Sequence, residues 1–175
     1  MMIPFRRFIT LAEFIEEAEK GKRKYVAVNY SDETQERLRD YAKKHGFDLS
    51  VGYDGSPQNA SDFGFHTTIF FSTTKHDIEN GKTRLKEPGT VNAVSYELLG
   101  EDKNIPVIRV ESKGLNDMRS HYEDFHGMAD AWPTYKPHIS MSYAKENLPD
   151  VTKIPLPTFP LIYDTVVIDD VKEQE

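Results

Sequence analysis

One order of predicted elements, strand, helix, strand, strand, occurs twice along the chain. Breaker-free runs rich in Val, Ile and Tyr predict the strands, and apolar residues at helical spacing predict the helices. The first set covers residues 24–30, 31–45, 65–71 and 92–100. The second set covers residues 106–112, 115–126, 136–143 and 161–171. The sequence therefore predicts one duplicated α/β (α+β) domain over residues 1–175, with lobes of about 1–100 and 104–175.

Three further segments complete this prediction. Thr10 and Glu13 form a capping box, so Thr10–Lys20 is expected to be a short packing helix of the first lobe. The segment from Leu49 to Gly64 is rich in Gly and Ser, which is typical of a long loop able to cover a cleft. The segment from Thr73 to Gly89 is polar and turn-rich, which is typical of a connection rather than a strand.

The composition excludes several classes of chemistry. The 175 residues include no cysteine, so disulfides, Cys-based zinc sites, iron–sulfur clusters and thiol nucleophiles are excluded. With 22 basic and 29 acidic side chains, the formal net charge of −7 argues against binding along long nucleic acids. No run of about 18 apolar residues and no secretion signal is found. We therefore expect a soluble, cytoplasmic protein that does not contact a membrane.

Two short motifs lie on corresponding strands of the two sets: His66-Thr67-Thr68 and His138-Ile139-Ser140. Side chains alternate across a strand, so the histidine and the hydroxyl of each motif share one face. The opposite face is expected to carry Thr67, Ile69 and Phe71 in the first strand and Ile139, Met141 and Tyr143 in the second. A single motif of this kind is weak evidence for a site. Two motifs at corresponding places in the two sets are much stronger evidence. Packing of the two sets about a pseudo-twofold axis would build a cleft with two imidazoles and two hydroxyls.

This group of side chains can break a phosphodiester without a metal. One neutral histidine takes the proton from an attacking hydroxyl, and the other, protonated, gives a proton to the leaving oxygen. Their ordinary pKa near 6.5 suits both roles. The hydroxyls of Thr68 and Ser140 can donate to the non-bridging phosphate oxygens as charge builds there. We predict His66, Thr68, His138 and Ser140 as the catalytic residues, and the sequence leaves open which histidine is the acid.

The paired motifs resemble the signature of the two-histidine (2H) phosphoesterase superfamily. Within it, the chain resembles the tailed-phage anti-CBASS nucleases through VAVNYSDETQ, FHTTIFFS, HDIENG, NIPVIRVES and DAWPTYKPHISMSY. The resemblance implies two pseudo-symmetric antiparallel-sheet lobes with helices outside and a central cleft. It also implies metal-independent cleavage of 3′–5′ bonds in cyclic di- and trinucleotides in the host cytosol. Ser140 stands where many relatives have Thr, which keeps the hydroxyl but loses the β-methyl that limits its rotamers, and activity is expected to survive this change.

The segment before the second motif holds three candidate substrate-binding residues, Trp132, Tyr135 and Lys136. Aromatic rings at the edge of a cleft can stack on bases of any kind. The alternative is that Trp132 and Tyr135 anchor the loop on the core. Lys136 shares a strand face with His138 and can supply positive charge for a phosphate, although it could equally be an ordinary solvated lysine.

The other histidines are expected to be structural. They are His45, His76, His121 and His126. His121 and His126 are five residues apart on a predicted helix, so we expect them on different faces rather than together as metal ligands. With no H-E-x-x-H pattern, no paired Asp and no Cys/His cluster, we expect no metal and no cofactor.

The sequence thus predicts a monomeric phosphodiesterase with a small cyclic oligonucleotide as its substrate. Two alternatives remain open. An RNA 2′,3′-cyclic phosphodiesterase acting on RNA ends would use the same four residues. A non-catalytic protein that sequesters cyclic nucleotides would need the motifs only for binding.

Overall fold

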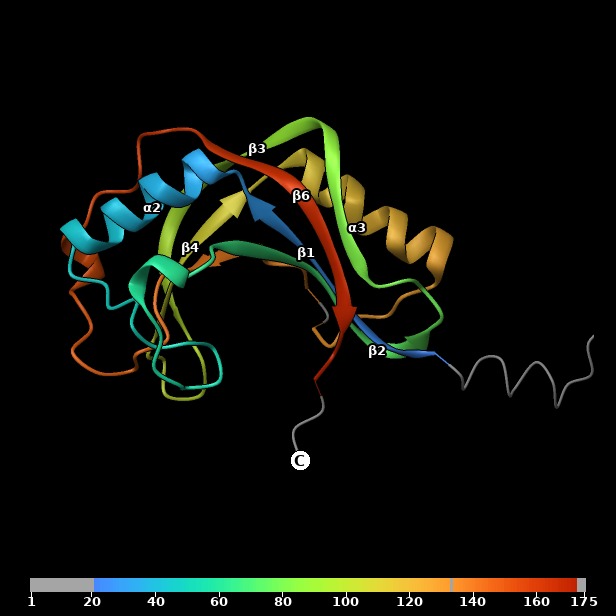
Figure 1. Cartoon of the computed structure of the whole chain (residues 1–175), viewed down its shortest axis with the longest axis horizontal. Coiled ribbons are helices and arrows are strands. Elements are labelled where there is room, and N and C mark those ends of the chain that lie inside the picture. The colour runs from blue at the N-terminus through green and yellow to red at the C-terminus, as the bar shows by residue number, and fades with distance from the viewer. Residues whose placement is uncertain (1–20, 133, 173–175) are drawn as a thin grey trace, which may run out of the picture.

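The computed structural model describes residues 21–132 and 134–172 (Figure 1). Its strands and helices are β1 Lys22–Tyr30, α2 Asp32–Lys44, β2 His66–His76, β3 Gly81–Leu99, β4 Ile105–Glu111, α3 Lys113–His126, β5 His138–Ser140 and β6 Leu161–Asp170, with short 3₁₀ turns at Ala60–Asp62 and Val151–Lys153. The order strand, helix, strand, strand occurs twice, as predicted. The helix predicted at Thr10–Lys20 lies outside the described residues. No helix in the described part of the chain is long and apolar enough to cross a membrane.

The strands form one antiparallel sheet in the order β2-β1-β6-β3-β4-β5. This confirms a mixed α+β fold built on antiparallel pairing, but the structure has one sheet where we expected two. The reason lies in β3, which is 19 residues long and belongs to both halves. Its residues up to Val91 pair with β6, and its residues from Asn92 onward pair with β4. Figure 1 shows β3 and β6 arching between α2 on one side and α3 on the other.

Both helices begin at a serine cap. The hydroxyl of Ser31 accepts a hydrogen bond from the Thr34 amide, and that of Ser112 accepts one from the Leu115 amide, each at 3.3 Å. An N-cap hydroxyl satisfies one of the amide groups that have no partner within the helix. Because Ser112 is the cap, α3 begins two residues before the predicted start. Gly127 ends α3 with a φ of 63°, a conformation that glycine adopts without steric cost.

The connection predicted at Thr73–Gly89 was wrong, because most of it is strand. β2 continues to His76 by pairing with the start of β1, and β3 begins at Gly81 by pairing with the end of β6. These strand ends are largely exposed on both faces. They therefore show no alternation of apolar and polar residues, and only the neighbouring strands reveal them.

A β-bulge interrupts β2 directly after Thr68. Ala27 pairs with Thr68 and the preceding Val26 pairs with Phe70, so Ile69 is an extra residue in β2. A bulge changes which face the following side chains occupy. Phe70 is therefore the buried residue and Phe71 lies on the other face, which corrects the predicted orientation of Phe71.

The two edge strands of the sheet, β2 and β5, meet through a chain of side-chain hydrogen bonds. The Thr67 hydroxyl donates to the His138 carbonyl at 3.0 Å. Since Thr67 has one hydrogen to give, the Tyr30 hydroxyl must donate to Thr67 Oγ1, at 2.8 Å. Thr67 is fully buried, and Tyr30 is almost so. We call this group of Tyr30, Thr67 and His138 the β2–β5 joint.

Arg119 of α3 holds the bulge in place. Its Nη1 donates to the Ile69 carbonyl at 3.0 Å and forms an ion pair with Asp130. Its guanidinium lies over the rings of Phe70 and Tyr135, 4.6 and 4.5 Å from their centroids. A bulge disrupts the ladder of backbone hydrogen bonds, and a buried carbonyl needs a partner. Arg119 supplies that partner.

We predict that Arg119→Met lowers the free energy of unfolding by about 3 kcal/mol, because it leaves the buried Asp130 charge and the Ile69 carbonyl without their cation. Urea denaturation measures this. The matched control is Arg37→Met, which breaks an exposed pair with Glu33 at 2.9 Å and should cost at most about 0.5 kcal/mol. Equal losses in the two variants would contradict the role given to Arg119.

Candidate active site

The two predicted motifs lie on the edge strands that the β2–β5 joint brings together. His66, Thr68, His138 and Ser140 are all partly exposed. The intervening residues Thr67, Ile69, Ile139 and Met141 are fully buried. The predicted alternation is thus confirmed within both motifs. The histidines are close enough that charge on His138 lowers the pKa of His66.

Both histidines are held in the same way by their own strands. The Nδ1 of His66 lies 3.3 Å from the Gly64 carbonyl, and the Nδ1 of His138 lies 2.9 Å from the Lys136 carbonyl. A carbonyl only accepts, so Nδ1 carries the hydrogen in both rings. Each imidazole is therefore fixed in the tautomer that leaves Nε2 free to take up or release a proton.

Burial is the main influence on the protonation of both rings, and it lowers the pKa of each below the ordinary 6.5. The carbonyls of Gly64 and Lys136 act in the opposite direction, because they favour the protonated rings. Charge on His138 lowers the pKa of His66 further. Both imidazoles are consequently mainly neutral at pH 7 in the free protein.

Each motif hydroxyl has a tyrosine beside it. The Tyr25 hydroxyl lies 3.0 Å from Thr68 Oγ1, and the Ser140 hydroxyl lies near enough to Tyr143 to oppose in part the rise in the Tyr143 pKa that burial causes. Burial raises the pKa of Tyr25 to about 12, so its hydroxyl remains protonated. Tyr143 therefore lies on the side of the site, and its predicted place on the opposite face is wrong. The strand ends at Ser140, so the alternation on which that prediction rested stops before Tyr143.

Charged side chains gather on the side of His138. Arg109 of β4 lies opposite His138 in the strand register, and its Nη1 donates to Glu97 of β3 at 2.9 Å. The hydrogen bond from Arg109 is the main cause that lowers the pKa of Glu97, and the charges of Lys136 and His138 add to it. Lys136 is exposed and lies outside β5, which begins at His138, and its role in binding a phosphate stays a prediction. Cations gather here in a chain whose net charge is −7.

The long loop of residues 49–64 packs beside the second motif. Phe63 stacks on Tyr143 with ring centroids 5.5 Å apart, and Tyr53 meets the edge of Tyr143 at the same distance. Tyr53 is 82% exposed. Its hydroxyl is near enough to affect the pKa of Tyr25. The loop therefore brings an exposed aromatic ring to the site.

The two predicted aromatic residues have different surroundings. Tyr135 is partly buried, its hydroxyl donates to the Thr68 carbonyl at 2.9 Å, and Arg119 covers one face of its ring. These contacts are those of a loop anchor. Trp132 is 59% exposed and meets the edge of Phe71 at 5.6 Å. Its binding of a base stays a prediction.

The remaining histidines lie apart from these motifs. His121 and His126 were expected on different faces of α3, but their rings lie 5.5 Å apart, because both contact Tyr122 near the end of the helix. Thr74 Oγ1 lies 2.6 Å from His76 Nε2. No group of three or more His, Asp or Glu side chains in residues 21–132 and 134–172 could hold a metal ion.

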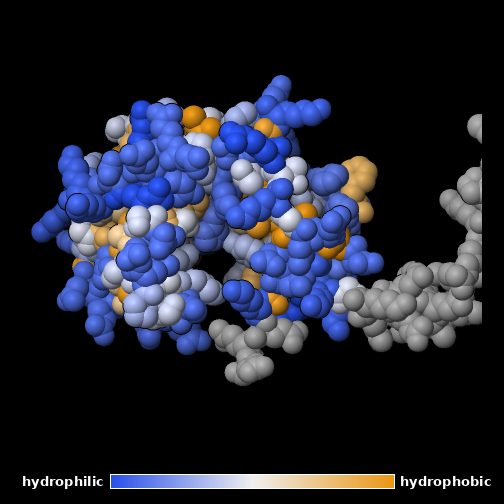
Figure 2. Space-filling model, in the orientation of Figure 1, coloured by the Kyte–Doolittle hydropathy of each residue, from blue (hydrophilic) through white to orange (hydrophobic). Residues whose placement is uncertain are grey.

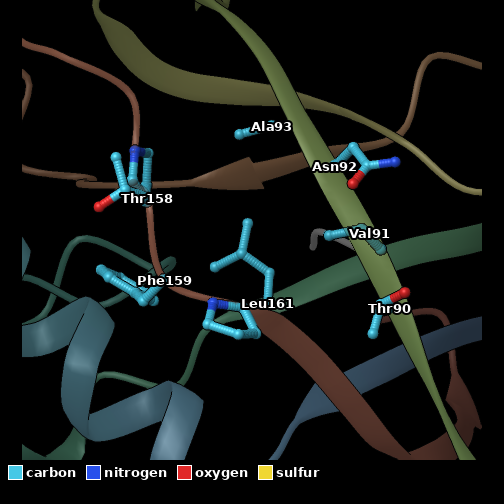
Figure 3. A pocket seen from close by; sticks show the side chains of 9 residues that line it. Thr90, Val91, Asn92, Ala93, Thr158, Phe159 and Leu161 are labelled. Carbon is cyan, nitrogen blue, oxygen red and sulfur yellow. The ribbon is translucent and has the colours of Figure 1, made fainter.

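The face in view in Figure 2 is hollowed between the half that carries α2 and the half that carries α3. A cavity of about 440 Å³ lies elsewhere, between β3 and the segment that leads into β6 (Figure 3). It is lined by Thr90, Val91, Asn92, Ala93, Pro157, Thr158, Phe159, Pro160 and Leu161. None of the predicted site residues lines it, and it offers no titratable side chain.

Sequence reasoning missed four residues around the motifs. They are Tyr25, Glu97, Arg109 and Tyr143. Arg109 and Tyr143 lie within the stretches that carry the resemblance, but nothing in their spacing pointed to the site. Only strand pairing brings Arg109 opposite His138.

The family model of the anti-CBASS protein Acb1 matches residues 22–174, which is most of the chain. No curated protein matches the sequence.

Proposed function

Because the chain belongs to the family of the anti-CBASS protein Acb1, we propose that it is a metal-independent phosphodiesterase that hydrolyses the 3′–5′ bonds of cyclic di- and trinucleotides. The resemblance of the motifs implies that these cyclic oligonucleotides are the signals that trigger CBASS immunity. Their removal would let a phage evade that immunity, and the protein would act in the host cytosol. Its substrate is a small cyclic oligonucleotide rather than a long nucleic acid, and it acts as a monomer without a cofactor.

One observation supports this proposal most strongly: the two imidazoles are held alike. In both, Nδ1 donates to the carbonyl two residues earlier, so both Nε2 atoms are free. Cleavage by general acid and base needs one group that accepts a proton and one that donates. Two equivalent histidines near each other provide both roles. The two halves of the sheet, with one motif each, would then correspond to the two lobes of a 2H phosphoesterase.

In the proposed reaction, the 2′-hydroxyl of the substrate attacks the adjacent 3′-phosphorus. The neutral histidine takes the proton of that hydroxyl at Nε2 as the new O2′–P bond forms. The protonated histidine gives its Nε2 proton to O5′ as the P–O5′ bond breaks. The products are a linear oligonucleotide with a free 5′-hydroxyl and a 2′,3′-cyclic phosphate. Water can open this cyclic phosphate with the roles of the histidines reversed.

The hydroxyls of Thr68 and Ser140 stabilise the charge that develops on the non-bridging oxygens. The neighbouring tyrosines support this role. When Tyr25 donates to Thr68 Oγ1, the hydrogen of Thr68 remains available for the phosphate. Tyr143 lies beside Ser140 in the second motif. Lys136 contributes positive charge, and Trp132 remains a candidate for stacking on a base.

We predict that His66→Ala and His138→Ala each lower the turnover of a cyclic dinucleotide by about 10²- to 10⁴-fold, because each removes one proton-transfer group. Chromatography of the products in the presence of EDTA measures this. The control is His121→Ala, which removes a histidine on α3 that is outside the motifs and should leave turnover unchanged. Full activity in either motif variant, or loss of wild-type activity on adding EDTA, would contradict the assignment.

We predict that kcat/KM peaks below pH 6.5. The reaction needs one neutral and one protonated imidazole, and burial lowers the pKa of both below 6.5. Above both pKa values, the protonated fraction falls about tenfold per pH unit, so kcat/KM should fall about tenfold between about pH 7 and 8. Initial rates at substrate concentrations below KM give the profile. A constant kcat/KM over that interval would refute two low-pKa histidines as acid and base.

We predict that a cyclic dinucleotide with a 2′-deoxy group at every cleavable position is bound but not cleaved, because it lacks the attacking hydroxyl. Binding is followed by calorimetry and cleavage by chromatography. Turnover of this analogue would exclude internal attack.

The same assay separates the alternatives. Faster turnover of an RNA ending in a 2′,3′-cyclic phosphate than of any cyclic dinucleotide would favour action on RNA ends. Loss of one ligand per protein, without products, would favour a sequestering protein.

A further inference from the structure

Arg109 is placed beside the second motif by strand pairing. It lies on β4, directly opposite His138 of β5 in the antiparallel register. Directly opposite residues of a sheet project to the same face, with Cβ atoms about 5 Å apart. The charge of Arg109 also lowers the pKa of His138, which places the guanidinium near the imidazole. Arg109 therefore belongs to the same face of the sheet as the predicted catalytic groups.

The guanidinium of Arg109 has an N–H donor without a hydrogen-bond partner. Its Nη1 donates to Glu97 at 2.9 Å. Its Nε is buried and has no hydrogen-bond partner, and it is the one such side-chain atom in the part of the chain that the structure describes. A buried donor without an acceptor costs about 1 to 3 kcal/mol, so natural structures rarely keep one without a reason.

The ion pair with Glu97 leaves positive charge at this place. The charge of Lys136 also acts on Glu97, so one carboxylate faces the two cations Arg109 and Lys136. The side chain of Arg109 is 24% exposed, so part of it remains open to solvent. An anion that arrives beside His138 would meet donors that the protein itself does not fill.

We propose that Arg109 binds a non-bridging oxygen of the phosphodiester that lies between His66 and His138. This inference rests on the proposed function and adds to it the residue that holds the scissile phosphate. A planar guanidinium offers several N–H donors in fixed directions, and it can keep one acceptor in Glu97 while it takes another in the phosphate. A lysine at this position would keep the charge but lose that geometry. Glu97 holds Arg109 in place for this contact.

The main experiment compares Arg109→Lys with the wild-type protein on cyclic dinucleotides that carry a phosphorothioate of defined Rp or Sp configuration at the cleaved linkage. A charge-assisted hydrogen bond of about 1.5 to 3 kcal/mol corresponds to a loss of about 10- to 100-fold in kcat/KM for the all-oxygen substrate. Wild-type protein should cleave one diastereomer at least about tenfold more slowly than the other, since sulfur accepts the hydrogen bond poorly. In Arg109→Lys this difference should shrink to less than about threefold. A merely structural role of Arg109 would not change the stereochemical preference.

Two variants control this experiment. Arg84→Lys makes the same substitution at an arginine of β3 whose side chain is 84% exposed, and it should change kcat/KM by less than about twofold. Arg109→Gln keeps a polar side chain, although a shorter one, and removes the charge, so loss of folding in one Arg109 variant does not decide the outcome. Thermal unfolding establishes which variants are folded.

The outcomes separate this inference from the proposed function. Wild-type cleavage with an unchanged rate and an unchanged stereochemical preference in the folded Arg109 variants would overturn the role of Arg109 alone. Absence of cleavage of any cyclic dinucleotide by wild-type protein would overturn both. Loss of the preference in Arg109→Lys, with Arg84→Lys unaffected, would establish the contact.

Discussion

The hydrogen bond from the buried Thr67 hydroxyl to the His138 carbonyl is the interaction on which the candidate site depends. β2 and β5 are the opposite edges of one sheet, and no backbone ladder joins them. The hydroxyl of Thr67 donates to the His138 carbonyl where a ladder would provide a backbone amide. The hydroxyl of Tyr30, on β1, in turn donates to Thr67 Oγ1. An edge strand leaves unpaired backbone groups that need covering. Here the two edges contact each other at Thr67 and His138, and this contact brings the two histidines together.

The bulge at Ile69 and the arginine that supports it shape the other side of the site. The bulge turns Phe71 away from the core directly after Thr68, and Arg119 supplies the hydrogen bond that the Ile69 carbonyl requires. The same arginine lies over Tyr135, whose hydroxyl donates to the Thr68 carbonyl. α3, β2 and the loop before β5 are thus joined through one buried cation. The backbone of β2 is thereby held at Thr68 and Ile69, beside the first motif.

The local charge around His138 differs from the net charge of the chain. A net charge of −7 argues against broad attraction of polyanions, yet Arg109 and Lys136 gather where a phosphate would lie. Glu97 forms an ion pair with Arg109 alone, so the group as a whole stays positive. Under the proposed function, this local positive charge would bind the phosphate of a small cyclic oligonucleotide.

The sequence by itself determined the order of the elements and the alternation that places His66 and Thr68 on one face and buries Thr67 on the other. These features follow from local preferences of the backbone, so they can be read one segment at a time. Only the tertiary structure decided that β3 joins both halves into one sheet, that Ile69 bulges, and that Arg109 lies opposite His138. Each of these depends on strand register between segments far apart in the chain, which no local pattern encodes.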